Sequence, residues 1–331
     1  MLRDVVVIGA SAGGIDALRT IASGLPRDFP AAIFVVVHIS PHSPGILDSI
    51  LERAGPLPSV TVRDEEPIRP GCIYVPFPDH HLVVEEGIAR ATRGPRENLF
   101  RPAVDPLFRS AAQAFGPRVI GVVLSGGLDD GSAGLFAVKD RGGVAIVQDP
   151  AEAAVASMPL NAMRYVQVDH TLRVARIAPL LAELVRQPVQ EGGAPVPERM
   201  KLEVGIAKED APLEERVALL GEPSLYACPE CHGVLTRLRE GTNERYRCHT
   251  GHAYSQISLI ADMEERIEES VWSGIRALQE KAMLLRHMAG QDEAGRQELL
   301  ERAAEAEADI ERLRQITLRS DPPADELRRE S

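Results

Sequence analysis

The chain has 331 residues, which is long enough for one large domain and a smaller one. Its formal net charge of −12 disfavours a nucleic-acid partner, because binding a phosphate backbone requires a basic surface. No apolar run approaches the ~20 residues that span a bilayer, and the first residues lack the pattern of a secretory signal, so we expect no membrane insertion. Four cysteines without a disulfide framework favour a cytoplasmic location.

Four runs rich in Val and Ile predict strands that are buried on both faces of a sheet. The runs lie at 5–8, 31–37, 119–124 and 144–147. Helical patterns alternate with them, and a further helix is expected near 175–185, so the fold class is α/β with a doubly wound, mainly parallel sheet. Shorter strand-like pieces have joints rich in Pro and Gly and predict an antiparallel hairpin insertion. These pieces lie at 60–62, 72–75 and 81–85.

Composition changes predict five segments along the chain. They are an α/β domain at 1–187, a linker at 188–222, a cysteine- and histidine-containing module at 223–256, an amphipathic helical hairpin at 257–318 and a disordered tail at 319–331. In the hairpin, apolar residues recur in steps of three and four between Ile260 and Leu285, which is one face of a long helix. We expect this face to pack within the hairpin or in a homodimer, and an external signalling partner is the alternative.

Ser11 lies in the segment Gly9-Ala-Ser-Ala-Gly13, which fits the G-x-S-x-G pattern between a predicted strand and a predicted helix. Small neighbours allow a serine to occupy a sharp turn with its hydroxyl exposed above the sheet. The helix that follows offers backbone N–H groups for an oxyanion. A dinucleotide-binding turn is the competing interpretation, but Ser11 replaces the middle glycine of G-x-G-x-x-G, and no P-loop lysine follows.

Two other predicted strand ends carry polar side chains. His38 directly follows the second apolar run, and Asp129 and Asp130 lie in the glycine-containing segment after the third. Because the carboxyl ends of parallel strands share one edge of a sheet, we expect Ser, His and Asp to meet there. His38 would remove the proton from Ser11, while an aspartate fixes the histidine tautomer and stabilises the imidazolium. The chain order Ser, His, Asp disfavours the α/β-hydrolase fold, in which the order is Ser, Asp, His.

These segments resemble the catalytic domain of the CheB family, the bacterial chemotaxis protein-glutamate methylesterases, over roughly residues 3–186. The matching segments are Ile8-Gly-Ala-Ser-Ala-Gly-Gly14, Val36-Val-His38, Arg101-Pro-Ala-Val-Asp105, the Asp-Asp-Gly ending at Gly131, and Met158-Pro159. The resemblance implies that Ser11 is the nucleophile, His38 the base and Asp130 the triad aspartate, since the family's Asn-Asp-Gly aligns with residues 129–131. It implies a carboxylic ester hydrolase that needs no cofactor for catalysis. Its expected substrates are γ-glutamyl methyl esters on chemoreceptor-like helical proteins, with glutamine deamidation in some members.

Three features differ from the family pattern. Family enzymes usually carry an N-terminal receiver domain, whereas the first catalytic strand is expected here at about residue 4, so we expect the phosphorylation switch to be missing. Gly127 stands where the family loop commonly has a methionine near the active site. Ala12 stands where a threonine is common. A catalytically idle scaffold, which recruits a signalling partner through the cysteine module and the helices, is therefore the alternative function.

The cysteine module has the ligand spacing of a zinc ribbon. Cys228-Pro-Glu-Cys231 is followed by Cys248 and, four residues later, by His252. His249 and His232 are rivals for the fourth ligand position, but Gly251 lets the backbone turn before His252 and favours that residue. A site with four protein ligands is closed, so we expect a structural zinc ion. The module also resembles an appendage of some receiver-less family members.

Overall fold

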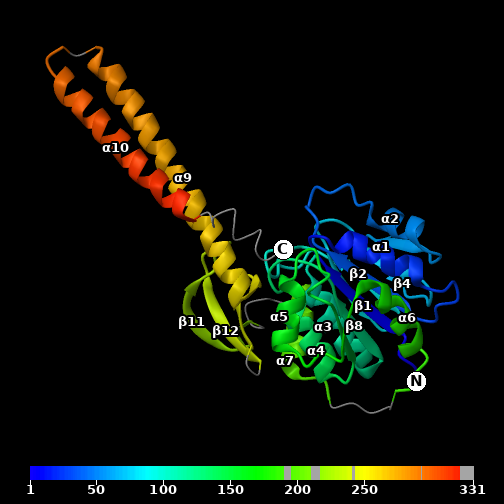
Figure 1. The fold of residues 1–331 in the computed structure, drawn as a ribbon. Helices are drawn as coiled ribbons and strands as arrows, with labels where there is room; N and C mark the ends of the chain where they lie inside the picture. The colour runs from blue at the N-terminus through cyan, green and yellow to red at the C-terminus, as the bar shows by residue number, and fades with distance from the viewer. Residues whose placement is uncertain (190–194, 210–216, 241–242, 292, 321–331) are drawn as a thin grey trace. The chain divides into compact units, whose positions relative to one another are not determined.

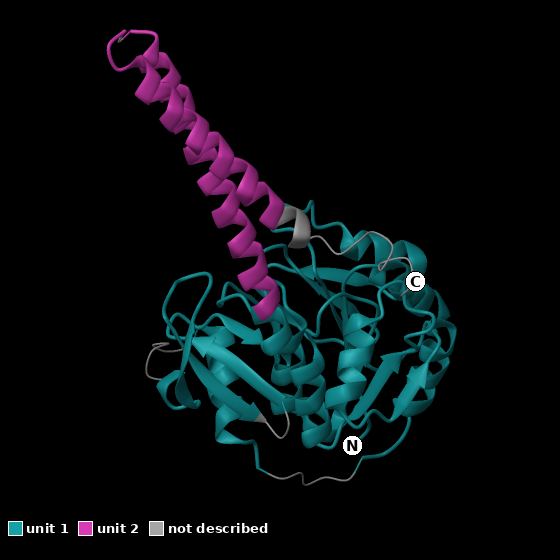
Figure 2. Cartoon of the chain, turned by 60° about the vertical axis from the view of Figure 1, so that its left-hand side comes forward, with its two compact units in different colours: residues 1–259 teal, residues 260–331 magenta. Residues whose placement is uncertain are grey.

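The structure of the protein is a computed structural model. It describes all residues except 190–194, 210–216, 241–242, 292 and 321–331. The chain divides into two compact units, Met1–Leu259 and Ile260–Ser331, which Figure 2 distinguishes by colour. The predicted tail at 319–331 lies outside the described residues from residue 321 onward, and so do parts of the predicted linker.

The first unit is built on a seven-stranded sheet in which every neighbouring pair of strands is parallel. Its strands are, in spatial order, β10 (His170–Leu172), β9 (Val144–Gln148), β8 (Val119–Val123), β1 (Val5–Ala10), β2 (Ala32–Val37), β5 (Ile73–Pro76) and β3 (Ser59–Val62). The four long Val- and Ile-rich runs form its centre, because a strand covered on both faces has no polar side. The predicted doubly wound parallel sheet is confirmed.

Helices cover both faces of this sheet (Figure 1). Alternate residues of β1 show the division: Val6 and Ile8 pack into one apolar core, and Val5 and Val7 into the other. The first core contains helices α1 (Gly14–Gly24), α2 (Leu47–Ala54) and α6 (Val174–Leu184). The second contains helices α3 (Val104–Phe115), α4 (Ser132–Asp140) and α5 (Ser157–Tyr165). The 3-10 turn η1 (Gly116–Arg118) connects α3 to β8.

The predicted antiparallel insertion is present, but two of the three segments expected in it belong to the main sheet instead. It is a three-stranded sheet of β4 (Glu65–Pro67), β7 (Ile88–Thr92) and β6 (His81–Glu85). The pieces expected at 60–62 and 72–75 instead form β3 and β5, which pair in parallel at the edge of the main sheet. Segments this short show no pattern of apolar residues that distinguishes parallel from antiparallel pairing.

The segment after α6 contains helix α7 (Glu198–Lys208), which lies within the predicted linker. Its Met200 and Val204 pack into the same core as α3, so this part of the chain is integrated into the first unit. A four-stranded antiparallel sheet follows, and the predicted metal ligands lie at the ends of its strands and in the loops between them. Its strands are β11 (Glu222–Ala227), β12 (Val234–Glu240), β13 (Asn243–Cys248) and β14 (Ala253–Ser255).

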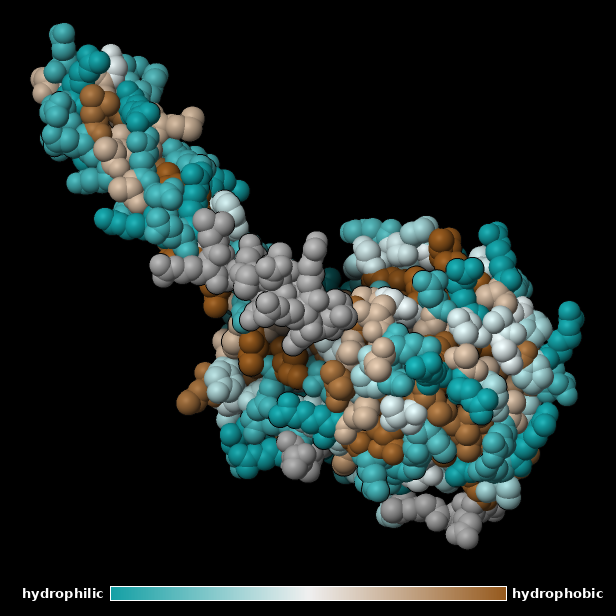
Figure 3. All heavy atoms as spheres, in the orientation of Figure 1, coloured by the Kyte–Doolittle hydropathy of each residue, from teal (hydrophilic) through white to brown (hydrophobic). Residues whose placement is uncertain are grey.

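Two long helices end the described chain, α9 (Gln256–Ala289) and α10 (Arg296–Ser320). Within the second unit, Ile275, Ala282, Ala303 and Ile310 are buried between them. Figure 3 shows a surface on this hairpin that is mostly hydrophilic, with hydrophobic atoms scattered along it. Among the described residues, no helix combines the length and the apolar character needed to cross a membrane.

Candidate active site and candidate metal centre

Ser11 occupies the turn between β1 and α1. Its backbone N–H donates to the carbonyl of Ser125 (2.9 Å), and Gly14 N–H donates to the carbonyl of Ser11 (3.0 Å), which fixes the turn. Gly13 adopts φ +74°, a conformation that favours glycine. Gly126 approaches so closely that an added Cβ would lie 2.7 Å from the Ser11 Cβ. Glycine at these positions therefore lets two chain segments meet at the serine.

His38 follows β2 and lies between Ser11 and Asp130. Its Nδ1 is 3.1 Å from Ser11 Oγ, and its Nε2 is 2.7 Å from Asp130 Oδ2. The ring of Phe100 stacks on the imidazole, with centroids 3.6 Å apart and planes 7° apart. The imidazole is thus held by hydrogen bonds at both nitrogens and by stacking on one face. This arrangement suits a base that accepts a proton at Nδ1 and donates from Nε2.

Asp130 lies between β8 and α4 and is buried. Its Oδ2 also accepts from the N–H of Val104 (2.7 Å), while Oδ1 accepts from Asn98 Nδ2 and Gly131 N–H (2.9 Å each) and from Asp105 N–H (3.2 Å). Burial by itself raises the pKa of Asp130, but the hydrogen bond and charge of His38, with these donors, hold the pKa below its ordinary value. Asp130 is therefore ionised beside the imidazole.

Asp129 takes a different position. Its Oδ1 accepts a hydrogen bond from Ser255 Oγ (2.7 Å), and no contact joins it to His38 among the described residues. Burial raises the pKa of Asp129 to about 6, against the opposing effect of Ser255. Of the two adjacent aspartates, the one singled out by resemblance to the family is thus the one that meets His38.

Two backbone N–H groups near Ser11 are suited to an oxyanion. In the part of the chain that the structure describes, no acceptor is recorded for the N–H of Ala12 or Gly127. A Cβ added to Gly127 would have no neighbour within 4 Å, so this loop residue faces open space. The N–H of the residue after a nucleophilic serine is a common oxyanion donor. The substitution of glycine for methionine at 127 leaves this backbone donor in place.

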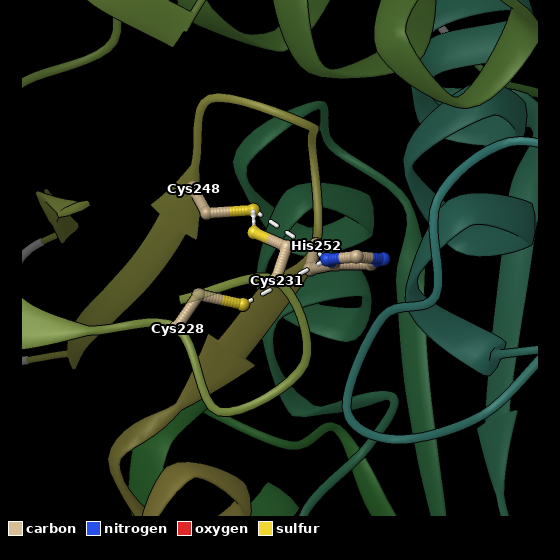
Figure 4. Close-up of side chains that lie close together, drawn as sticks. All are labelled: Cys228, Cys231, Cys248 and His252. Carbon is tan, nitrogen blue, oxygen red and sulfur yellow. Dashed lines mark hydrogen bonds between the residues drawn. The ribbon is translucent and has the colours of Figure 1, made fainter. Parts of the chain in front are cut away.

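The predicted metal ligands converge in the second site. Figure 4 shows Cys228, Cys231, Cys248 and His252 together, and their ligand atoms all lie within 4.8 Å of one another. The Nδ1 of His252 is 3.5 Å from the Sγ of Cys248 and 3.7 Å from that of Cys228. Gly251, with φ +93°, makes the turn that brings His252 back to Cys248.

The rival histidines lie outside this cluster. A Cβ added to Gly233 would come within 2.2 Å of the Nδ1 of His249, so the His249 ring packs over that glycine. His252 has a partner on its other nitrogen, because its Nε2 lies 2.5 Å from a carboxylate oxygen of Glu230. Such an outer carboxylate is usual behind a metal-binding histidine. Arg96, from the α/β domain, donates to the other oxygen of Glu230 (3.2 Å).

Two residues that precede α3, Asn98 and Phe100, belong to the site but were not predicted from the sequence. Asn98 donates to Asp130, and Phe100 stacks on His38, so both contact the predicted triad. Neither has a local pattern that marks a function. The only signal near them is the segment Arg101-Pro-Ala-Val-Asp105, which follows directly and was part of the family resemblance.

Most of the first unit is similar to proteins of a known family. The family model described as CheB methylesterase matches residues 6–181. A Leptospira interrogans protein is 37% identical over 192 residues, which is 58% of this chain and 100% of that protein. The Anaeromyxobacter dehalogenans protein-glutamate methylesterase/protein-glutamine glutaminase 2 is 43% identical over 183 residues, 55% of this chain and 54% of the relative, so this match spans about half of the relative.

A solved structure gives the same fold. The CheB methylesterase catalytic domain of Thermotoga maritima superposes with a TM-score of 0.53 and 34% identity, covering 55% of this chain and 98% of that domain. Protein-glutamate methylesterases, as these relatives are named, are carboxylic ester hydrolases. The chain belongs to the CheB methylesterase family.

Proposed function

We propose that the protein is a serine esterase that hydrolyses γ-glutamyl methyl esters on a chemoreceptor-like protein, with Ser11 as nucleophile, His38 as base and Asp130 as its partner. The observation that carries the proposal is one continuous set of hydrogen bonds. Ser11 Oγ is 3.1 Å from His38 Nδ1, and His38 Nε2 is 2.7 Å from Asp130. These are the contacts that a serine, a base and an orienting carboxylate need.

In the first half of the reaction, His38 Nδ1 accepts the proton of Ser11 as Oγ attacks the ester carbonyl. The N–H groups of Ala12 and Gly127 stabilise the oxyanion of the tetrahedral intermediate. The bond between the carbonyl carbon and the methoxy oxygen breaks, and the protonated His38 gives its proton to the leaving group, which departs as methanol. The product is an ester between Ser11 and the γ-carbonyl of the substrate glutamate.

In the second half, water replaces methanol. His38 removes a proton from the water as its oxygen attacks the acyl carbon, and the proton then passes to Ser11 Oγ as that bond breaks. The substrate leaves as a glutamate carboxylate. Deamidation of glutamine follows the same sequence with ammonia as the leaving group, which fits the double name of the relatives. We further propose a cytoplasmic location, as expected for chain thiols that form no disulfide.

Turnover of a methylated receptor fragment tests this proposal, with released methanol as the readout. Ser11→Ala is expected to abolish the release and to prevent labelling by a fluorophosphonate probe. Ser23→Ala is the matched control, because Ser23 is an exposed residue on α1 that bonds only to its own helix. Methanol release by Ser11→Ala at the rate of the unchanged protein would remove Ser11 from the mechanism. An unchanged protein that releases no methanol and is not labelled by the probe would favour an idle scaffold.

We also propose that Cys228, Cys231, Cys248 and His252 hold one structural zinc ion. Three thiols and one imidazole are a donor set that zinc prefers, and the carboxylate of Glu230 behind His252 supports that ligand. Bound zinc would stabilise the small β11–β14 sheet and takes no part in ester hydrolysis. Metal analysis of the purified protein should give about one zinc per chain. His252→Ala should lower this value and His249→Ala should not, and the reverse result would assign the fourth ligand to His249.

A further inference from the structure

Asn98 connects the predicted triad to the metal-binding module, defined as residues 223–259, which comprise the cysteine module and the start of α9. Its side chain is buried, and its Nδ2 donates both to Asp130 (2.9 Å) and to Asp105 (3.0 Å). Its Oδ1 accepts from the N–H of Ser255 (3.0 Å) and from Ser258 Oγ (3.1 Å). An amide side chain has two donors and room for two acceptor bonds, so every position is used and the amide has one orientation. That orientation depends on residues about 160 positions later in the chain.

The backbone around Asn98 is joined to the same module. Asn98 N–H donates to the carbonyl of Ala253 (2.8 Å), and Ala253 N–H donates to the carbonyl of Arg96 (3.1 Å). The turn that contains Asn98 is closed by hydrogen bonds in both directions between Glu97 and Phe100 (3.0 and 3.2 Å). The ring that stacks on His38 is therefore attached to the turn that β14 holds.

Buried charges strengthen this attachment. Arg247 on β13 is fully buried and donates to Glu97 (2.8 Å) and to Glu203 of α7 (3.3 Å). On its other side, the Glu97 carboxylate accepts from the buried Arg109 of α3. Separating one member of such a group would leave uncompensated charge in the interior, which is strongly unfavourable. The module is thus fixed to the residues beside the active site.

We propose that Asn98 is a positioning residue of the esterase and that the module of residues 223–259 holds it in place, so that the state of the metal centre governs the activity of the triad. The inference rests on the proposed function. The candidate ligand His252 directly precedes Ala253, and the Glu230 behind it bonds to Arg96, so the metal centre and residues 96–100 share two connections. Loss of these connections frees Asn98 to turn away from Asp130 and loosens the stacking of Phe100 on His38.

The first test replaces the donors of Asn98 and keeps its acceptor. Asn98→Asp retains an oxygen for Ser255 and Ser258, and aspartate tolerates the left-handed backbone found there (φ +49°). It places a carboxylate against Asp130, so we expect kcat on a model ester to fall about 100-fold with little change in KM, as for a misplaced catalytic group. The far-downfield proton resonance of the His38–Asp130 hydrogen bond should also disappear. Leu99→Asn, at the next residue (φ +76°), is the control and should change neither readout.

The second test changes the metal-binding module instead of Asn98. Ser258→Ala removes one hydrogen bond to Asn98, and we expect kcat to fall about tenfold, which corresponds to the worth of one such bond. Ser224→Ala, in β11 of the same module, should have no effect. Removing metal from the full-length protein with a chelator should slow fluorophosphonate labelling of Ser11 and raise hydrogen exchange of residues 96–100, and added zinc should reverse both changes.

The outcomes separate the two proposals. If Ser11→Ala retains methanol release, the esterase proposal fails, whatever the module does. If Ser11 is required but Asn98→Asp and Ser258→Ala turn over at the rate of the unchanged protein, the module has no positioning role and the esterase proposal stands. Equal labelling rates and equal exchange at 96–100 with and without zinc would overturn control by the metal centre.

Discussion

Asp130→Asn is the sharpest perturbation of the proposed triad, because the structure defines every donor around this carboxylate. Oδ2 accepts from His38 and Val104, and Oδ1 accepts from Asn98, Gly131 and Asp105. An asparagine has one oxygen and one NH₂ group. On the Oδ1 side the NH₂ group would face only donors. On the Oδ2 side it would face Val104 N–H and His38 Nε2, which can accept a hydrogen bond only if the imidazole carries its proton on Nδ1.

The expected loss of activity in Asp130→Asn follows from these hydrogen bonds. If the amide oxygen turns toward Asn98, Gly131 and Asp105, the NH₂ group faces His38 and drives its proton to Nδ1, the nitrogen that must accept the proton of Ser11. The corresponding change in a serine protease lowers kcat about 10⁴-fold by selecting the wrong tautomer. We expect kcat/KM to fall about 10³- to 10⁴-fold, which is about 4–5.5 kcal/mol of transition-state stabilisation.

Methanol release from a methylated receptor fragment measures this loss, and near-UV circular dichroism checks that the variant is folded. Asp129→Asn is the matched control, because the amide keeps an acceptor for Ser255 and Asp129 does not contact His38. A folded Asp130→Asn that retains more than a tenth of the activity would refute the assigned role. A larger loss in Asp129→Asn than in Asp130→Asn would assign the role to the other aspartate.

Three further predictions follow from individual contacts. Phe100→Ala removes the ring that stacks on His38 and should lower kcat/KM about tenfold, whereas Phe100→Tyr keeps the ring and should not, as measured by ester turnover. Gly126→Ala should inactivate the enzyme and slow probe labelling, since the new Cβ would lie 2.7 Å from the Ser11 Cβ, while Gly127→Ala has open space and should stay active. The pKa of Asp129 is raised to about 6, so the folded state retains a proton that the unfolded state loses, and stability falls as pH rises from about 4 to 6. Asp129→Asn should remove this loss and raise the free energy of unfolding at pH 8 by up to about 3 kcal/mol, measured by urea denaturation.

The main sheet and the convergence of Ser11 and His38 could be predicted because their signals are local. Unbroken runs of Val and Ile indicate strands with two covered faces, and a residue that follows such a strand lies at the carboxyl edge of the sheet. The convergence of Cys228, Cys231, Cys248 and His252 was predictable for the same reason, since knuckle spacing is a property of short segments. Asp130 needed the family resemblance, because nothing local distinguishes it from Asp129.

The partners of Asn98 could not be predicted, because they depend on contacts between segments far apart in the chain. Ser255 and Ser258 lie about 160 residues downstream and look like ordinary polar residues at a helix start. The burial of a charged side chain is equally difficult to predict from a sequence. Arg247 and Glu203 would be taken for solvated residues, yet both are buried and paired with each other. Charged residues are almost never fully buried unless paired, and pairing is a property of the fold.

Asp105 and Asp129 are buried close enough to Asp130 for its negative charge to raise the pKa of both, and the three carboxyl groups therefore differ in their tendency to ionise. Burial and the negative charge of Asp130 raise the pKa of Asp105 to about 7, and burial raises that of Asp129 to about 6. Only Asp130 has enough donors to hold its pKa below the ordinary value. Asn98 lies between Asp105 and Asp130 and donates to both without adding a charge. The site thus concentrates its negative charge on the carboxylate that faces His38, where the imidazolium forms during acyl transfer. The module of residues 223–259 supports this division of charge, because its Ser255 N–H and Ser258 Oγ donate to Asn98 Oδ1 and so orient the Asn98 NH₂ group toward the two carboxyl groups.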